Sequence, residues 1–255
     1  MTPPKNHGPF GAPYLRHIAT LEDRCDPTRY PFNIRAFAGG IDLKLDAKVT
    51  FLVGENGSGK STLLEAIAEH CGFHVDGGNR DHHRAVFSER SDFAHALRLS
   101  WLPKATEGFF MRAESFYNFA TYLDEVSDMR AYGGKSLHQQ SHGESFLSLF
   151  DNRFEQGIYL LDEPEAALSP QRQLSFLKII HDLATPGHAQ FLIATHSPIL
   201  LSYPDAELYS LDGDSIAPID YRDTEHFRLT RDFLNAPERY HKHLFAADDE
   251  DDGSV

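Results

Sequence analysis

Eight residues early in the chain have the types and spacing that phosphate binding requires. Residues 54–61 read "GENGSGKS", with glycine at three of the first six positions. Glycine adopts positive φ without strain, so the backbone N–H groups can face one anion at the start of the following helix. We expect Lys60 to reach the β- and γ-phosphates of a nucleotide, and the Ser61 hydroxyl to ligate Mg²⁺. The remaining residues expected around the nucleotide are Gly54, Glu55, Asn56, Gly57, Ser58, Gly59 and Thr62.

A pair of adjacent acids ends a second apolar stretch. Residues 158–163 read "IYLLDE", and this apolar run predicts a buried strand that closes on Asp162 and Glu163. A carboxylate at such a strand end can hold Mg²⁺ through water, while its neighbour polarises an attacking water. After a glycine-rich phosphate loop, this pair indicates metal-dependent hydrolysis of a nucleotide.

The segments around these motifs have the periodicity of an α/β domain. Continuous apolar runs predict buried strands, helical spacing predicts the segments between them, and strand, helix and strand with short connections form a parallel crossover. We predict a mixed sheet with a parallel core, antiparallel edge strands and a small helical lobe. The expected buried strands are 48–53, 157–163 and 189–197, the expected helices 60–71 and 170–184, and the expected edge strands 32–37 and 41–45.

Two further stretches complete a resemblance to the ATP-binding-cassette (ABC) superfamily of P-loop ATPases. "QSHGES" at 140–145 resembles its signature motif, and "ATHSP" at 194–198 resembles its switch-histidine strand. Glutamate at 144, where glutamine is usual, is similar to the chromosome-maintenance (SMC) and DNA-repair branch. Only about 80 residues separate Lys60 from Ser141, which leaves no room for the coiled coil of that branch. The chain therefore resembles the compact, soluble "predicted ATPase" group that carries the AAA label.

The resemblance implies a role for several side chains. Glu163 would be the general base or would position the attacking water, and His196 would contact the γ-phosphate. Ser141, Gly143 and Glu144 would complete the ATP site of another subunit, with the helix start at Gly143 facing the anion.

Two positions of the family pattern have more than one candidate here. The loop that usually carries a glutamine falls near 109–116, where Arg112 or Glu114 stands instead, and Glu114 is taken as a further metal ligand beside Ser61 and Asp162. The aromatic ring that stacks on adenine would be Tyr30, because Phe32 is expected in the core.

Composition restricts the environment and the partners. The formal charge of −14 does not support a surface that tracks nucleic acid, although a local basic patch is compatible with it. No apolar run reaches 18 residues and the N-terminus lacks a signal-peptide pattern, so we expect a cytoplasmic protein that meets a membrane only through a partner.

We expect an N-terminal arm over 1–31, one ABC-type domain over 32–245 with a helical insert lobe near 72–150, and a disordered acidic tail over 246–255. One phosphate loop and one signature per chain imply a head-to-tail homodimer on ATP binding, or a pair with a different ABC subunit, driven by Mg-ATP and coupled to an unknown protein partner. Three uses remain open: a soluble ATPase of repair, maintenance or defence, the ATP-binding subunit of a membrane transporter, and a nucleotide sensor without hydrolysis.

Overall fold

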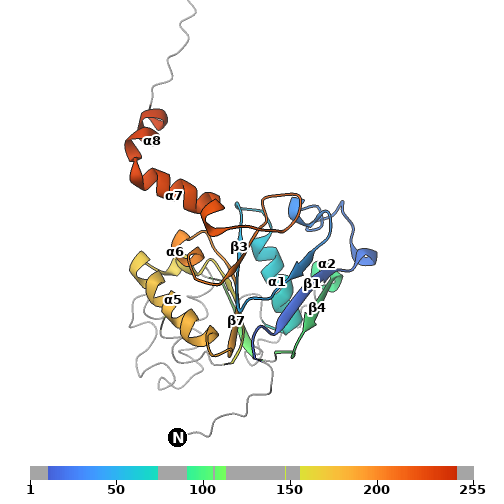
Figure 1. Ribbon diagram of the computed structural model, residues 1–255. Coiled ribbons are helices and arrows are strands. Elements are labelled where there is room, and N and C mark those ends of the chain that lie inside the picture. Colours follow the sequence, from blue (N-terminus) through green and yellow to red (C-terminus); the bar gives the residue numbers. More distant parts are fainter. Residues whose placement is uncertain (1–10, 74–90, 106, 113–146, 148–155, 246–255) are drawn as a thin grey trace, which may run out of the picture.

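A central parallel sheet organises the structure, a computed structural model that describes residues 11–73, 91–105, 107–112, 147 and 156–245. Its six strands follow the order β5-β6-β7-β3-β8-β9, and every pair is parallel except β8 with β9 (Figure 1). The strands are β3 (Val49–Val53), β5 (Gly108–Arg112), β6 (Gly157–Asp162), β7 (Ala189–Ala194), β8 (Glu207–Ser210) and β9 (Ala217–Pro218).

Helices cover both faces of this sheet, which explains its continuous apolar strands. Along β3, Phe51 belongs to the core that includes Phe176 of α5, whereas the next residue, Leu52, belongs to the core that includes Leu63 of α1. Successive side chains of a strand point to opposite faces, so a strand buried on both faces must be apolar throughout. The helices of the two faces are α1 (Lys60–Cys71), α5 (Pro170–Ala184) and α6 (Pro198–Leu201).

A three-stranded antiparallel sheet adds to the core on the α1 side. Its order is β2-β1-β4, with β1 at Leu15–Thr20, β2 at Asp42–Lys44 and β4 at Leu97–Trp101, the last preceded by α2 at Asp92–Ala96. The fully buried Gln190 of β7 connects the two sheets. Its Oε1 accepts from the amides of Tyr14 and Leu15 at 2.8 Å each, and its Nε2 donates to Leu15 O at 2.9 Å.

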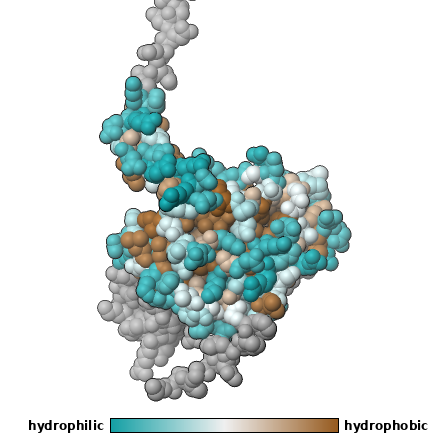
Figure 2. All heavy atoms as spheres, viewed as in Figure 1, coloured by the Kyte–Doolittle hydropathy of each residue, from teal (hydrophilic) through white to brown (hydrophobic). Residues whose placement is uncertain are grey.

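The C-terminal helices α7 (Glu225–Asn235) and α8 (Pro237–Leu244) extend outward from the body of the domain (Figure 1). Neither helix buries a residue, and apolar side chains remain exposed along both, among mostly hydrophilic neighbours (Figure 2). These side chains are Leu229, Phe233, Leu234, Leu244 and Phe245. Among the described residues, no helix has the length and apolar character needed to cross a membrane.

The structure confirms the predicted fold class and its central elements. The strands expected at 48–53, 157–163 and 189–197 are β3, β6 and β7, and the helices expected at 60–71 and 170–184 are α1 and α5. Helix α1 ends as expected, with Gly72 in the left-handed conformation as its C-cap.

Two expectations are wrong within the described residues. Residues 15–20 are not part of an extended arm, because β1 pairs with both β2 and β4. Residues 32–37 are not a strand but a turn and a short 3-10 helix at Arg35–Phe37, which buries Ala36 and Phe37. Residues 97–101 and 108–112, within the insert range expected near 72–150, form strands β4 and β5 of the two sheets. Most other residues of that range, and the tail over 246–255, lie outside the described residues.

Candidate nucleotide site

The glycine-rich loop joins the carboxyl end of β3 to the first turn of α1. Gly59 caps the helix with φ of 103°, and a Cβ added there would lie 2.7 Å from Cζ of Phe37, so the loop needs glycine for its conformation and for its close contact with the core. Lys60 is nearly buried, and its Nζ donates to the carbonyl oxygens of Gly54 at 2.6 Å and Glu55 at 2.9 Å. Burial lowers the pKa of this ammonium group, while nearby carboxylates oppose that shift.

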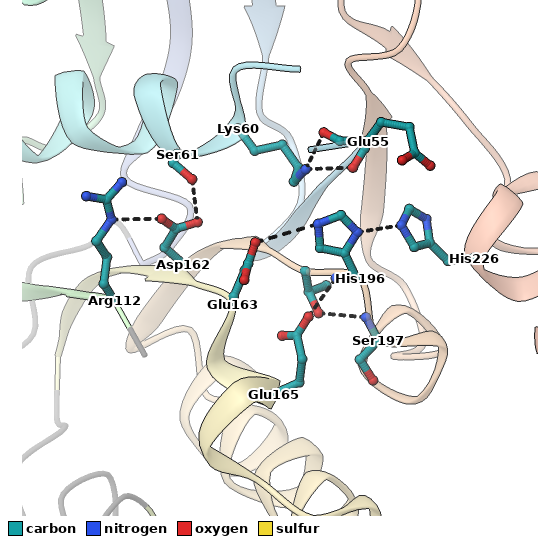
Figure 3. A network of polar contacts seen from close by, with 12 residues as sticks. Glu55, Lys60, Ser61, Arg112, Asp162, Glu163, Glu165, His196, Ser197 and His226 are labelled. Atoms are coloured by element: carbon teal, nitrogen blue, oxygen red, sulfur yellow. Dashed lines mark hydrogen bonds and ion pairs between the residues drawn. The ribbon is translucent and has the colours of Figure 1, made fainter. Parts of the chain in front are cut away.

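The two residues expected to hold Mg²⁺ lie next to each other. The Ser61 hydroxyl donates to Asp162 Oδ1 at 3.1 Å, although 101 residues separate them in the chain (Figure 3). On the other side, Arg112 Nε lies 3.1 Å from Asp162 Oδ2, and Arg112 Nη2 lies 2.6 Å from Glu65 Oε1. A hydroxyl and a carboxylate beside a phosphate loop fit Mg²⁺, which takes few protein ligands and completes its shell with phosphate and water oxygens.

Glu163 and His196 face each other at the ends of neighbouring strands. The register pairs Asp162 with Ala194, and the amide of Glu163 donates to Ala194 O at 2.9 Å. The chain leaves the strand at this point, and the backbone of Glu163 adopts the left-handed conformation, with φ of 51° and ψ of 50°. The resulting distance from His196 Nε2 to Glu163 Oε1 is 3.6 Å. The structure thus brings together the expected base and the expected phosphate-sensing residue.

The ring nitrogen Nε2 of His196 is buried and makes no hydrogen bond to any described residue. Buried polar atoms rarely lack a partner, so one that does at a candidate site indicates a ligand group. Burial, and then the positive charge of Lys60, lower the pKa of His196. The ring is therefore neutral at neutral pH and can present an N–H to an anion.

Glu165 holds the backbone at His196 in place through a hydrogen bond. Its Oε1 accepts from the amide of His196 at 2.6 Å, and burial raises the pKa of its carboxyl group. The next residue, Ser197, caps α6 with its hydroxyl, which also donates to Gln173 Oε1 at 2.5 Å. Both bonds fix the position of His196 rather than touching the nucleotide.

Two residues near the site carry no signal in the sequence. His226 of α7 lies with its Nε2 2.6 Å from Nδ1 of His196 (Figure 3). Asp212, in the turn after β8, accepts a bond from the amide of Glu55 at 2.7 Å. Asp212 could have been suspected because β8 is the parallel neighbour of β3, but nothing in the local pattern around His226 points to the site.

Tyr30 lies beside the first turn of α1. Its hydroxyl is 3.0 Å from Thr62 Oγ1 and its side chain is 69% exposed, whereas Phe32 is buried in the core. An exposed ring fixed at the helix start is available to stack on a base. The other expected contacts, Ser141, Gly143, Glu144 and the candidate ligand Glu114, lie outside the described residues.

Comparisons with known proteins agree with this geometry. Residues 32–106 match a family described as "AAA domain", and residues 139–202 match one described as "AAA domain, putative AbiEii toxin, Type IV TA system". The ribose import ATP-binding protein RbsA 2 of Burkholderia cenocepacia is 29% identical over 225 residues, which are 75% of this chain and 42% of that protein. The hemin import ATP-binding protein HmuV of Aliivibrio fischeri is 26% identical over 77% of this chain and 83% of that protein.

The chain has the fold and the site geometry of a P-loop ATPase of the ABC type. It spans about two fifths of the length of the ribose import relative. Among solved structures, the SMC head domain from Thermotoga maritima aligns with a TM-score of 0.47 and 16% identity, over 81% of this chain and 99% of that chain.

Proposed function

We propose that this chain binds Mg-ATP at residues 54–61 and hydrolyses it with Glu163 as the general base that activates water. The observation that carries the proposal is that Glu163 faces Nε2 of His196, which is buried and makes no hydrogen bond to a described residue, beside Lys60 and Asp162. This arrangement has a cation for the phosphates, ligands for a metal ion, a base for water and a neutral donor for the transferred group.

Each residue has a defined task in that reaction. Lys60 exchanges the carbonyl oxygens of Gly54 and Glu55 for β- and γ-phosphate oxygens. Ser61 and Asp162 would hold Mg²⁺, which would supply positive charge opposite the phosphates. A water oxygen then bonds to the γ-phosphorus as the bond to the bridging oxygen of ADP breaks, and Glu163 takes the water proton. The Nε2–H of His196 donates to a γ-phosphate oxygen and stabilises its charge.

The second half of the site would come from another copy of the chain. One phosphate loop and one signature-like stretch at 140–145 per chain support a head-to-tail pair with two composite ATP sites. ATP would close this homodimer and hydrolysis would open it, so the cycle could move an unidentified protein partner in the cytoplasm. Under this proposal the ATPase cycle serves DNA repair, chromosome maintenance or defence. Glu144 favours the first two, because glutamate at this position is similar to the chromosome-maintenance and DNA-repair branch.

A second candidate is the ATP-binding subunit of a membrane transporter. The names of the related proteins favour it, since RbsA 2 and HmuV are both described as import ATP-binding proteins. The two candidates share the same ATP chemistry and differ in the partner. Stimulation of ATP hydrolysis by duplex DNA would favour the first, whereas co-purification with a membrane protein would favour the second.

The dimer is tested with Glu163→Gln, which keeps the side-chain shape and removes the base. With saturating Mg-ATP, this variant is expected to elute as a dimer in size-exclusion chromatography with light scattering, and to hydrolyse ATP at least about 100-fold more slowly than the wild type. Lys60→Ala in the same experiment is the control that stays monomeric. A Glu163→Gln protein that binds ATP but remains monomeric contradicts the composite site, and one with wild-type turnover contradicts the role of Glu163.

A further inference from the structure

His196 lies between an acid and a second histidine. Its Nε2 faces Glu163 Oε1 at 3.6 Å, and its Nδ1 lies 2.6 Å from Nε2 of His226, with the two ring centroids 4.7 Å apart. His196 follows β7 of the central sheet, whereas His226 belongs to the first turn of α7. The C-terminal helix thus contacts the side chain that we expect to meet the γ-phosphate, at the ring nitrogen that does not face Glu163.

The direction of the hydrogen bond between the two imidazole rings decides the tautomer of His196. If His226 donates from Nε2, then Nδ1 of His196 accepts and the proton of His196 must sit on Nε2. If His196 donated from Nδ1 instead, its Nε2 would present a lone pair to the carboxylate of Glu163 and to a phosphate oxygen. Two anions disfavour that lone pair and favour an N–H, so the arrangement selects His226 as the donor.

The position of His226 is determined by the start of α7. Thr224 is almost fully buried, donates its hydroxyl to Tyr221 O at 2.7 Å and accepts from the amide of Phe227 at 3.3 Å. The rings of Tyr221 and Phe227 pack with centroids 4.6 Å apart on either side of this cap. His226 is therefore presented by an anchored helix terminus and not by a freely moving side chain on a loop.

We propose that His226 is a positioning residue that holds His196 in the Nε2–H tautomer, so that the switch histidine donates to the γ-phosphate. The part of this proposal that concerns hydrolysis rests on the proposed function. It makes the anchored start of α7 a component of the ATP site, although His226 itself does not touch the nucleotide.

The direct test is the protonation of the His196 ring, read from its nitrogen chemical shifts in ¹⁵N-labelled protein without nucleotide. The His196→Asn spectrum assigns the signals among the 15 histidines. In the wild type we expect a protonated Nε2 and a bare Nδ1. In His226→Phe, which cannot donate, we expect the Nδ1–H form to become populated. A wild-type Nδ1–H tautomer, or a tautomer unchanged by His226→Phe, overturns the proposal whether or not the chain hydrolyses ATP.

Turnover gives a second measurement that separates positioning from folding. We expect His226→Phe to lower kcat about 10- to 100-fold with KM within about threefold, because a donor to the transition state is lost. His226→Gln keeps an amide donor at a similar reach and should recover kcat to within about fivefold of the wild type. Thr224→Ala, which weakens the cap of α7 without removing the donor, is the matched control. Equal losses in all three variants would assign His226 a structural role only.

Discussion

Lys60 is hydrogen-bonded to the carbonyl oxygen of Gly54, the first residue of its own phosphate loop, at 2.6 Å. The ammonium group of Lys60 thus bonds to two carbonyl oxygens of its own loop, and a nucleotide must offer this group stronger acceptors than those carbonyls. Phosphate oxygens do so because they are charged and the ammonium group is already largely desolvated. The loop is consequently shaped around the cation before ATP arrives.

Replacement of Lys60 is expected to abolish tight nucleotide binding while leaving the fold intact. Hydrogen bonds to charged groups contribute about 1.5–3 kcal/mol, so Lys60→Ala should weaken ATP binding by at least about 10- to 150-fold. Titration calorimetry with Mg-ATP measures the loss, and circular dichroism checks the fold. Unchanged affinity in a folded variant would remove the assignment of residues 54–61.

Two glycines of the loop are expected to differ when replaced by alanine. Both have positive φ, but a Cβ at Gly59 would lie 2.7 Å from Phe37 Cζ, whereas a Cβ at Gly57 meets no atom within 4 Å. Gly57→Ala should cost only backbone strain, about 1–2 kcal/mol in the free energy of unfolding. Gly59→Ala should cost about 1–3 kcal/mol more, through overpacking against the core. Urea unfolding without nucleotide compares the two, and equal costs would contradict the described contact.

Tyr30 is expected to recognise the base and not the phosphates. Stacking on an aromatic ring contributes about 1–3 kcal/mol, so Tyr30→Ala should weaken ATP binding about 5- to 150-fold. Tyr30→Phe keeps the ring and loses only the hydroxyl contact with Thr62, so its affinity should stay within about threefold. Inorganic tripolyphosphate, which has no base, should bind the wild type and Tyr30→Ala equally. A parallel loss for tripolyphosphate would mean that Tyr30 acts on the loop instead.

Gln190 is expected to be among the polar residues most important for stability. Gln190→Leu leaves two buried amides and one buried carbonyl of residues 14–15 without their partners, at about 1–3 kcal/mol for each group. The free energy of unfolding should fall by at least about 3 kcal/mol in urea titrations. Gln171→Leu, on an exposed position of α5, is the control and should change it by about 0.5 kcal/mol or less. Similar values for the two variants would show that the connection between the sheets contributes little.

The lowered pKa of His196 predicts a dependence of stability on pH. Between the ordinary value of 6.5 and the lower value in the folded protein, the unfolded chain binds the proton more readily. The contribution of His196 is therefore complete above pH 6.5 and is lost as the pH falls below it. Unfolding free energies of the wild type and His196→Asn, measured from pH 8 to 5, should diverge at high pH and converge toward low pH. A constant difference would contradict the lowered pKa.

The central elements could be predicted because their sequences satisfy local and global requirements together. Strands β3, β6 and β7 are mostly apolar, as burial on both faces demands, and α1 begins at its glycine-rich loop and ends at Cys71, with Gly72 as its C-cap. The positions of Ser61, Asp162 and Glu163, which we propose as Mg²⁺ ligands and general base, follow from the same elements, since parallel strands place their carboxyl ends at one edge of the sheet.

The features that sequence reasoning missed depend on distant partners. Strand β1 lies among Pro and Gly residues and gains its conformation from pairing with β2 and β4. Residues 32–37 alternate as a strand would, yet Phe32, Ala36 and Phe37 all reach one core because the chain turns there. His226 is one of 15 histidines, and only the packing of α7 brings it to His196.

The left-handed backbone of Glu163 has a consequence for how this protein can be altered. A non-glycine residue in that conformation costs about 1–3 kcal/mol, and here the cost falls on the residue that we propose activates water. Glycine at position 163 would relieve the backbone strain and would also remove the carboxylate, giving a more stable but inactive protein. Selection for thermal stability alone would therefore favour a substitution that abolishes turnover. Stability and catalysis thus compete at this one residue.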